Sequence, residues 1–218
     1  MMNRLSIPES WRNRVLAVAD LSGGEIHDYL DEAERRIFDS FRFDTRRIEW
    51  GASRVAAKLL AVELGLCTSP IECAIPTHSE RPKAFLSGGP SNLVVSISHS
   101  GGAGAAAFDR GPVGIDLQEI QHVHPRTTKY FLNDEEHEIV DDPNLDSPLI
   151  HLWSAKEAVW KVEQGEGWYR SGRVSLVERS ESGLVLDWAR HGSRGRVETR
   201  RIDDRFVLAM AWPGIDRA

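Results

Sequence analysis

The stretch that decides the fold class and the chemistry is Trp153–Lys161, which reads Trp-Ser-Ala-Lys-Glu-Ala-Val-Trp-Lys. Glu157 and Lys161 stand four residues apart, so on a helix they share one face and place a carboxylate beside an ammonium group. An earlier stretch, Val113–Leu117, is a short strand-like run with a lone carboxylate, Asp116, near its end. Mg²⁺ typically binds through one or two carboxylates plus substrate phosphate oxygens. Two such carboxylates with a lysine beside them therefore predict metal-assisted chemistry on a phosphate.

The residues around these two stretches predict the elements that carry them. Ser147 and Pro148 form a cap followed by proline at the first helical position, so we expect a helix from about Pro148 to Glu163. A short helix should precede it, with Asn133 as N-cap and Glu136 at the third helical position. We also predict three strands before the long helix, at residues 93–98, 104–108 and 113–117, and four after it, at residues 173–178, 184–189, 196–202 and 205–212.

The N-terminal part of the chain has a similar make-up. We predict a strand at residues 15–19 and then a helix over residues 22–41, where apolar residues recur at helical spacing. A second helix should begin with Asp44 as its cap and end at Gly65. One side of this second helix is basic, and it is either a solvated face or a ligand-binding stripe. Its residues are Arg47, Trp50, Arg54 and Lys58.

Two successive groups of helices and strands predict the α+β fold class with two halves of similar make-up. We place the halves at residues 1–110 and 111–218, with the metal site in the second. The chain of 218 residues is 41% hydrophobic and contains seven tryptophans, which is sufficient for packed cores. No internal sequence repeat is visible between the two halves.

Bulk composition excludes several classes of protein. No run approaches the ~20 apolar residues that span a bilayer, and residues 1–8 lack the apolar core of a secretion signal. Cys67 and Cys73 lack metal-type spacing and are interpreted as reduced thiols. We therefore expect a cytoplasmic protein with no membrane partner, and we expect it to be a monomer.

The net charge of −6 argues against general affinity for nucleic acid. The charge is uneven, because residues 170–201 contain eight arginines and only four acidic residues. This basic segment either receives an acidic partner or forms solvated strand faces, and the sequence favours neither.

Together the motifs resemble the signature of the Sfp-type 4'-phosphopantetheinyl transferases. That signature contains a Gly-hydrophobic-Asp strand end, matched by Gly114–Asp116, and then Trp/Phe-Ser-x-Lys-Glu-(Ala/Ser)-x-x-Lys, matched at every constrained position by Trp153–Lys161. A Ser-His-Ser turn is present at Ser96–Gly101, and a Gly-x-Gly follows the helix at Gly165–Gly167. Order and spacing agree roughly from Arg47 to Gly167.

The resemblance implies a pseudo-dimer of two similar α+β halves with the cofactor bound between them. It also implies a Mg²⁺-dependent enzyme that transfers the 4'-phosphopantetheine arm of coenzyme A to a serine of an apo acyl or peptidyl carrier protein. Asp116 and Glu157 would be metal ligands, Lys161 would offset charge on the leaving phosphate, and Glu157 or a metal-bound water would be the base. Lys156 would contact a phosphate or a carboxylate.

The same resemblance implies residues that bind coenzyme A. His99 and Ser98 would contact the nucleotide phosphates, and the basic helix would lie near the adenosine 3'-phosphate. Arg81, in Glu80-Arg81-Pro82-Lys83, would replace the lysine of a Gly-Lys-Pro element whose glycine is absent here. The full set is Arg47, Arg54, Lys58, Arg81, Ser98, His99 and Lys161.

The chain departs from the family pattern at Gln118, where many members carry a second acid. Side chains alternate along a strand, so residues 116 and 118 should face one side and Glu119 the other. We therefore expect a two-carboxylate site in which Gln118 acts on Mg²⁺ through a water.

Other interpretations remain open from the sequence. Ser154 and Glu157 also match a capping box, and Glu157 with Lys161 could be an ordinary surface pair. His122 and His124 could suggest zinc, although the pair lies in a polar linker with no cysteine nearby. At the level of function, the alternatives are a non-catalytic relative that binds coenzyme A or a carrier protein, and an unrelated Mg²⁺-dependent phosphohydrolase.

Overall fold

The structure is a computed structural model, and it describes residues 2–75, 83–86, 89–123, 127–128, 131–141, 146–163, 173–180 and 182–214. The chain divides into two compact units, Met1–Gly111 and Pro112–Ala218, called unit 1 and unit 2 below. Within the described ranges, no helix has both the length and the apolar character that a membrane crossing requires.

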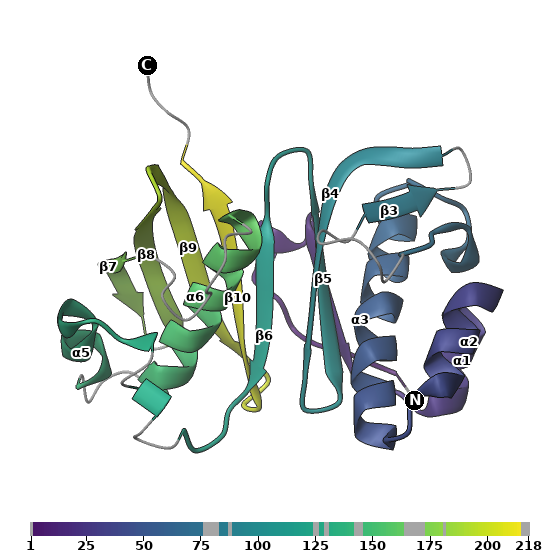
Figure 1. The fold of residues 1–218 in the computed structure, drawn as a ribbon, viewed down its shortest axis with the longest axis horizontal. Coiled ribbons are helices and arrows are strands. Elements are labelled where there is room, and N and C mark those ends of the chain that lie inside the picture. Colours follow the sequence, from purple (N-terminus) through teal and green to yellow (C-terminus); the bar gives the residue numbers. More distant parts are fainter. Residues whose placement is uncertain are drawn as a thin grey trace. The chain divides into compact units, whose positions relative to one another are not determined.

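Unit 1 is built on a five-stranded antiparallel sheet with strand order β1-β2-β5-β4-β3 (Figure 1). The predicted strand at residues 15–19 is confirmed as β2, and the predicted strands at 93–98 and 104–108 lie within β4 and β5. The strands are β1 (Asn3–Arg4), β2 (Val15–Ala19), β3 (Lys83–Leu86), β4 (Gly89–Ser100) and β5 (Ala103–Asp109).

Three α-helices belong to unit 1: α1 (Gly23–Tyr29), α2 (Glu32–Ser40) and α3 (Asp44–Glu63). The prediction of one helix over residues 22–41 is wrong. Asp31 is an N-cap that accepts a hydrogen bond from the Glu34 amide, and this capping box starts a new helix. The predicted cap of α3 is also wrong, since Asp44 is the first helical residue and the N-cap, Phe43, makes no side-chain capping bond.

The long helix α3 packs on β2, β4 and β5, and α1 and α2 lie against it (Figure 1). Most of its length is buried, including three of the four residues of the basic side. Trp50 and Arg54 are each 5% exposed and Lys58 is fully enclosed, so the interpretation of this side as a solvated face is wrong.

Unit 2 repeats this plan with a five-stranded antiparallel sheet of order β6-β10-β9-β8-β7 and a long helix, α6, packed on it (Figure 1). The helix spans Pro148–Glu163, as predicted, and the short helix α5 (Asp134–Val140) has the predicted cap at Asn133. All five strands were predicted with small differences at their ends. They are β6 (Gly114–Glu119), β7 (Arg173–Ser180), β8 (Gly183–Arg190), β9 (Ser193–Ile202) and β10 (Phe206–Pro213).

The edge strand of this sheet, β7, is irregular. Leu176 pairs with Leu186 and Glu178 pairs with Val185, so Val177 is an extra residue in the strand. Leu176 and Val177 are 39% and 48% exposed.

A glycine in each unit lets the long helix approach a strand closely. A Cβ at Gly104 of β5 would lie 2.2 Å from the Ala52 carbonyl carbon of α3. A Cβ at Gly114 of β6 would lie 1.9 Å from the Ala158 carbonyl oxygen of α6. The two units therefore have the same kind of helix-on-sheet contact, and the predicted α+β class with two similar halves is confirmed.

Candidate phosphate-chemistry site in unit 2

The candidate site is built on β6, at the point where α6 crosses it. Asp116 lies in the middle of β6 opposite Ala209 of β10, and its side chain is fully buried. The strand can lie this close to α6 because Gly114, two residues earlier, has no side chain. A carboxylate held in the interior requires charged or hydrogen-bonding partners, and α6 supplies them.

Ser154 fixes α6 to the backbone of β6. Its Oγ donates a hydrogen bond to the Asp116 carbonyl oxygen at 3.1 Å, and the residue lies in the interior of the helix. The interpretation of Ser154 and Glu157 as a capping box is therefore wrong, because α6 begins at Pro148. The serine of the motif connects helix and strand at the site.

Lys161 is the positive group of the site. Its Nζ donates to Asp116 Oδ1 at 2.9 Å and to the Ile115 carbonyl oxygen at 2.8 Å. The same Nζ lies 3.6 Å from Glu157 Oε1, one helical turn earlier. The lysine side chain is only 18% exposed, so this is not an ordinary surface pair of the kind that contributes little to stability.

Gln118 lies on the same side of β6 as Asp116, as the strand alternation predicts. Its Nε2 donates to Asp116 Oδ2 at 3.0 Å and to Glu157 Oε2 at 3.4 Å. One amide group therefore contacts both carboxylates, which shows that the two carboxylates converge on a common point. Glu119 is directed elsewhere, and its carboxylate lies 4.0 Å from Arg205.

The convergence changes the acidity of Glu157. Burial and the negative charge of Asp116 raise the pKa of Glu157 to about 7, although Lys161 opposes the shift. Burial alone would lower the pKa of Lys161, but the charges of Asp116 and Glu157 outweigh it and raise that pKa. At neutral pH the site thus combines a permanent ammonium, a buried carboxylate and a second carboxyl that can exchange a proton.

The donor set fits a small oxygen-seeking cation. Asp116 Oδ2 and Glu157 Oε2 face the same point, and the Gln118 side chain there carries a carbonyl oxygen as well as its NH₂ group. Mg²⁺ accepts such a small set of carboxylates because it keeps water and substrate oxygens as further ligands. Across the described part of the chain, no group of three or more His, Cys, Asp or Glu side chains gathers as a metal site. The zinc interpretation thus has no support among these residues, and His124 lies outside them.

Lys156 does not join this cluster. Its Nζ contacts Glu136 Oε2 of α5 at 2.6 Å and donates to the Phe131 carbonyl oxygen, and the side chain is 3% exposed. Burial lowers the pKa of Lys156, while the hydrogen bond and charge of Glu136 oppose the shift. Of the three predicted catalytic residues, the structure therefore brings Glu157 and Lys161 together and holds Lys156 in a separate buried pair.

Apart from Lys161, the predicted coenzyme A residues within the described part of the chain belong to unit 1, and they differ in accessibility. Lys58 is enclosed, with its Nζ 2.8 Å from Glu34 Oε2, which gives it a role inside the core. Arg54 stacks 3.6 Å above the Trp50 ring and donates to the Trp50 carbonyl oxygen at 3.2 Å. Burial lowers the pKa of Arg54 to about 10. Arg47 is more open, and it pairs with Asp44 at 2.7 Å.

The Ser-His-Ser element forms the end of β4. Ser98 is 6% exposed, and His99 Nδ1 lies 3.7 Å from Glu49 Oε2 of α3. His99 is thus held between a strand end and the long helix of unit 1. Arg81 and the Gly165–Gly167 element lie outside the described residues.

Sequence reasoning missed the partner of each buried lysine. Glu136 was predicted as the third residue of a helix cap, and the structure confirms that cap while also burying the carboxylate against Lys156. Glu34 was not singled out at all. The signal that the two pairs share is a capping-box glutamate in the short helix before each long helix, together with a lysine in the long helix.

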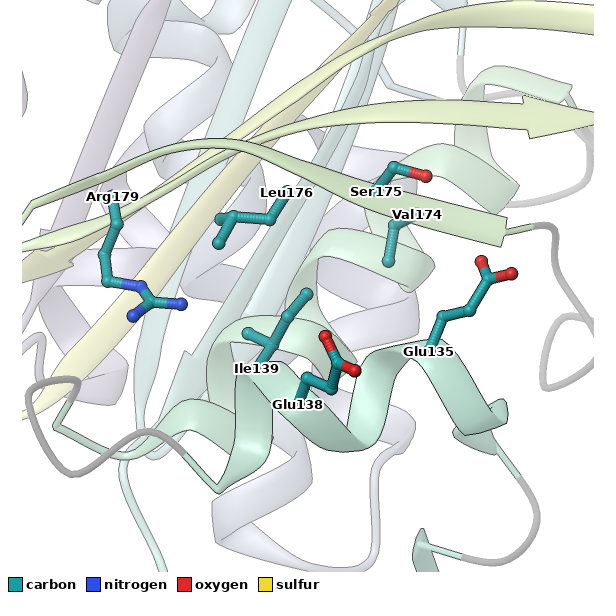
Figure 2. Close-up of a pocket in the computed structure, with 7 residues that line it drawn as sticks. All are labelled: Glu135, Glu138, Ile139, Val174, Ser175, Leu176 and Arg179. Atoms are coloured by element: carbon teal, nitrogen blue, oxygen red, sulfur yellow. The ribbon is translucent and has the colours of Figure 1, made fainter.

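A separate hollow of about 550 Å³ lies between α5 and β7, and neither Asp116 nor Glu157 lines it. Figure 2 shows its acidic side chains and Ile139 on α5, and its other apolar side chains and Arg179 on β7. It is lined by Glu135, Glu138, Ile139, Val174, Ser175, Leu176 and Arg179.

Comparison with known proteins agrees with this geometry. Residues 112–211 match the family described as the 4'-phosphopantetheinyl transferase superfamily, and this range contains the whole candidate site. The chain is 32% identical over 120 residues to 4'-phosphopantetheinyl transferase psf-1 of Bacillus pumilus, covering 53% of this chain and 51% of that protein. It is 27% identical over 123 residues to 4'-phosphopantetheinyl transferase ffp of Bacillus subtilis, covering 55% and 54%.

The chain thus spans about half the length of the curated relatives that it matches. The matched family range nearly coincides with unit 2. It contains the two motifs Gly114–Asp116 and Trp153–Lys161, whose side chains converge in space. Residues 112–211 of the chain therefore belong to the 4'-phosphopantetheinyl transferase superfamily, and the family resemblance predicted from the motifs is confirmed.

Proposed function

We propose that the protein transfers the 4'-phosphopantetheine arm of coenzyme A to a serine hydroxyl of an apo acyl or peptidyl carrier protein. The observation that carries this proposal is the convergence of Asp116, Glu157 and Lys161 within the family range. In the reaction, the serine oxygen forms a bond to the phosphorus on the pantetheine side of the diphosphate. The bond from that phosphorus to the bridging oxygen breaks, and its electron pair leaves with adenosine 3',5'-bisphosphate.

Glu157, or a metal-bound water that it holds, is the proposed base. With no metal bound, burial and the charge of Asp116 raise the pKa of Glu157 to about 7, so this carboxyl can exchange a proton near neutral pH. Its position on α6 is set by the contacts of the neighbouring turns, which hold it beside Asp116. The general requirement for phosphoryl transfer is a fixed geometry with charge complementarity, and this cluster supplies both.

Lys161 would offset the negative charge that develops on the leaving phosphate. Its ammonium remains protonated at neutral pH because Asp116 and Glu157 raise its pKa. Asp116 therefore has two tasks: it orients Lys161 through Oδ1, and it directs Oδ2 toward the point shared with Glu157. Preorganised charges of this kind act without further rearrangement when the transition state forms.

Mg²⁺ is the proposed metal, and Asp116 and Glu157 would hold it directly, with Gln118 acting through a water. When bound it would neutralise the diphosphate as a Lewis acid. Gln118 contributes by binding both carboxylates and keeping them at one point. We also propose that the protein acts as a monomer in the cytoplasm. Size-exclusion chromatography with light scattering measures the oligomeric state.

Coenzyme A recognition would involve unit 1 through His99 and Arg47, together with Arg54. The predicted partner of these side chains is the adenosine 3'-phosphate. Dephospho-coenzyme A should therefore bind more weakly than coenzyme A by roughly 1–3 kcal/mol, the scale of lost charge-assisted hydrogen bonds. Equal affinities by calorimetry would contradict the assignment of these residues.

The direct test is to incubate the protein with Mg²⁺, coenzyme A and a panel of apo carrier proteins, and then to measure carrier masses. The expected result is a mass increase equal to one phosphopantetheine group on at least one carrier, with adenosine 3',5'-bisphosphate released in equal amount. Hydrolysis of the diphosphate without transfer would identify the phosphohydrolase alternative. Binding of coenzyme A with neither reaction would identify a non-catalytic relative.

A further inference from the structure

The buried pair of Lys156 and Glu136 links four segments of unit 2. Lys156 projects from α6, Glu136 from α5, and the ammonium also donates to the carbonyl oxygen of Phe131, ahead of α5. The carboxylate accepts hydrogen bonds from the backbone amides of Asn133 at 2.9 Å and Val174 at 3.3 Å. Since Val174 belongs to β7, one ion pair fixes α5, the segment before it, and β7 to the helix of the site.

The same arrangement occurs in unit 1. Lys58 of the long helix α3 pairs with Glu34, which is the third residue of the capping box of the short helix α2. Lys58 also donates to the Cys73 carbonyl oxygen, and Glu34 accepts from the Ile75 amide at 3.2 Å. In both units a short capped helix and the segment after the long helix are thus attached to one buried lysine. The same lysine–glutamate arrangement occurs in two units whose surroundings differ, so we interpret it as a structural feature of the fold.

Lys156 and the site residues hold different sides of α6. Ser154 and Lys161 bind the backbone of β6, while Lys156 holds a different side of the helix to α5. Successive residues on a helix are separated by about 100°, so Glu157 has a fixed direction when its neighbours on both sides are anchored. A charge left without its partner in this buried contact between α5 and α6 would disrupt the contact and let the Glu157 carboxylate move away from Asp116.

We propose that Lys156 is a positioning residue for the site, and that its pair with Glu136 fixes the rotation of α6 so that Glu157 faces Asp116. The catalytic part of this inference rests on the proposed transfer function. Lys156 cannot contact a substrate phosphate and keep this pair, because its ammonium is enclosed by Glu136 and Phe131. Moving it would leave a buried carboxylate without its partner charge, which is strongly unfavourable.

The test is a double-mutant cycle with Lys156→Met, Glu136→Gln and the combined variant. Lys156→Met should lower kcat/KM by roughly 10–100-fold, the range found when a group that orients a site ligand is removed. Glu136→Gln should lower it as well, although Lys156 is intact. The combined variant should regain most of the lost rate, because Met and Gln keep the contact between α5 and α6 packed without an unpaired charge, and the Gln amide oxygen can still accept the Val174 N–H. The effects should fall on kcat more than on KM for coenzyme A.

Arg36→Met is the matched control, since it removes a cation from the exposed Arg36–Glu32 pair on α2 and should leave transfer unchanged. A combined variant that folds but transfers as poorly as Lys156→Met would overturn the inference, because the ammonium itself would then be required. Full activity of Glu136→Gln would overturn it too, and this variant decides the matter if the combined one does not fold.

Amide hydrogen exchange separates this inference from the proposed function. Lys156→Met should speed exchange at residues 157–161 and at Val174, and the combined variant should restore protection, whatever reaction the protein catalyses. Unchanged exchange in Lys156→Met would overturn the positioning role. A wild-type protein that modifies no carrier would instead overturn the proposed function and leave the exchange result to decide the role of Lys156.

Discussion

Gln118 is the residue at which this site differs most from the family pattern, and its amide contacts both carboxylates. In the absence of a cation, the NH₂ group is a hydrogen-bond donor between Asp116 and Glu157, and it reduces the repulsion between them. With a cation bound, the amide oxygen would accept a hydrogen bond from a metal-bound water, and a rotation about the last side-chain bond exchanges the amide oxygen and the NH₂ group. A glutamine can therefore serve both states of the site, whereas a glutamate can serve only one.

Gln118→Glu should separate these two states. Without Mg²⁺ the variant should have a lower Tm, because a third carboxylate replaces a donor and like charges are crowded together. With Mg²⁺ its Tm should rise more than that of the wild type, and the Mg²⁺ midpoint for transfer should fall. Gln118→Met is the control that removes the amide without adding charge. An unchanged midpoint in Gln118→Glu would show that residue 118 does not act on the metal.

Asp116→Asn and Glu157→Gln test the two carboxylates themselves. Each keeps the shape of the side chain and removes one charge, so each should lower kcat/KM by at least ~10²-fold, the scale of one preorganised charge contact. Glu119→Gln is the matched control on the same strand, because its side chain faces away from the site. Near wild-type transfer by either site variant, measured by carrier mass, would remove that carboxylate from the mechanism.

His151 gives unit 2 a predictable dependence of stability on pH. Its Nδ1 lies 2.7 Å from Thr199 Oγ1 in the interior, and burial, with Arg200 nearby, lowers the pKa of His151 to about 4. The unfolded chain, with a histidine pKa near 6.5, binds the extra proton first as the pH falls. Stability is then complete above about pH 6.5 and is lost toward pH 4, by roughly 3 kcal/mol from this residue.

Urea unfolding of the wild type and His151→Gln between pH 4 and pH 7 measures this loss. The variant should have a flatter profile over that interval, because glutamine can accept the Thr199 hydrogen bond without titrating. Parallel profiles for the two proteins would show that His151 does not control the acid sensitivity.

The residues of the site were predictable where chemistry requires a given residue type at a given spacing. Asp116, Glu157 and Lys161 were found from a strand end and a helical i,i+4 pair, and the structure brings them together. Lys156 and Lys58 were given ligand roles from the family resemblance, and lysines are ordinarily exposed. Their burial depends on glutamates 20 or more residues away, and such long-range pairing leaves no local pattern in the sequence.

At the scale of elements, the contact between β6 and α6 determines whether the site can form. Gly114 is required there because any Cβ would collide with the Ala158 carbonyl oxygen. The strand brings Asp116, and the helix brings Glu157 and Lys161, so their separation depends directly on this approach. The site therefore lies where β6 and α6 meet, and Gly114 allows them to meet that closely.

Gly114→Ala should push β6 away from α6. We expect a loss of roughly 1–3 kcal/mol in the free energy of unfolding, as for other overpacked contacts, together with a loss of transfer activity. Gly111→Ala is the matched control, because no atom lies within 4 Å of the Cβ position there. Denaturant unfolding and transfer assays on both variants measure the two effects. A fully active, equally stable Gly114→Ala would contradict the close approach as a requirement.

Helices and strands were predicted well where the spacing of apolar residues agreed with the residues that start or end an element. The start of α6 matched because Ser147 and Pro148 mark it, and the strands of unit 2 matched because turn residues separate them. The N-terminal helix was predicted as one element because its apolar spacing continues from Leu30 to Ala33. The break comes from the Asp31–Glu34 capping box, a local hydrogen-bond pattern that competes with periodicity.

At the scale of the whole molecule, two units of similar plan each carry a sheet, a long helix and a buried lysine–glutamate pair. The sequence shows no repeat between them, because the shared plan is specified by few positions. A capping box, one lysine on the long helix and one glycine on a strand are sufficient to preserve it, and the remaining residues can differ. Fold class was therefore predictable from the order of elements, whereas the recurring pair required coordinates.

The irregular edge strand β7 has a consequence for how the protein behaves in concentrated solution. An exposed edge with two adjacent apolar side chains, Leu176 and Val177, would ordinarily invite a second molecule to add its own strand and begin aggregation. The extra residue Val177 interrupts the regular backbone pairing of β7 and twists the strand locally. It also shifts the charged residues Glu178 and Arg179 out of the register that a strand from a second molecule would need. The bulge thus acts as a barrier to self-association at this edge strand.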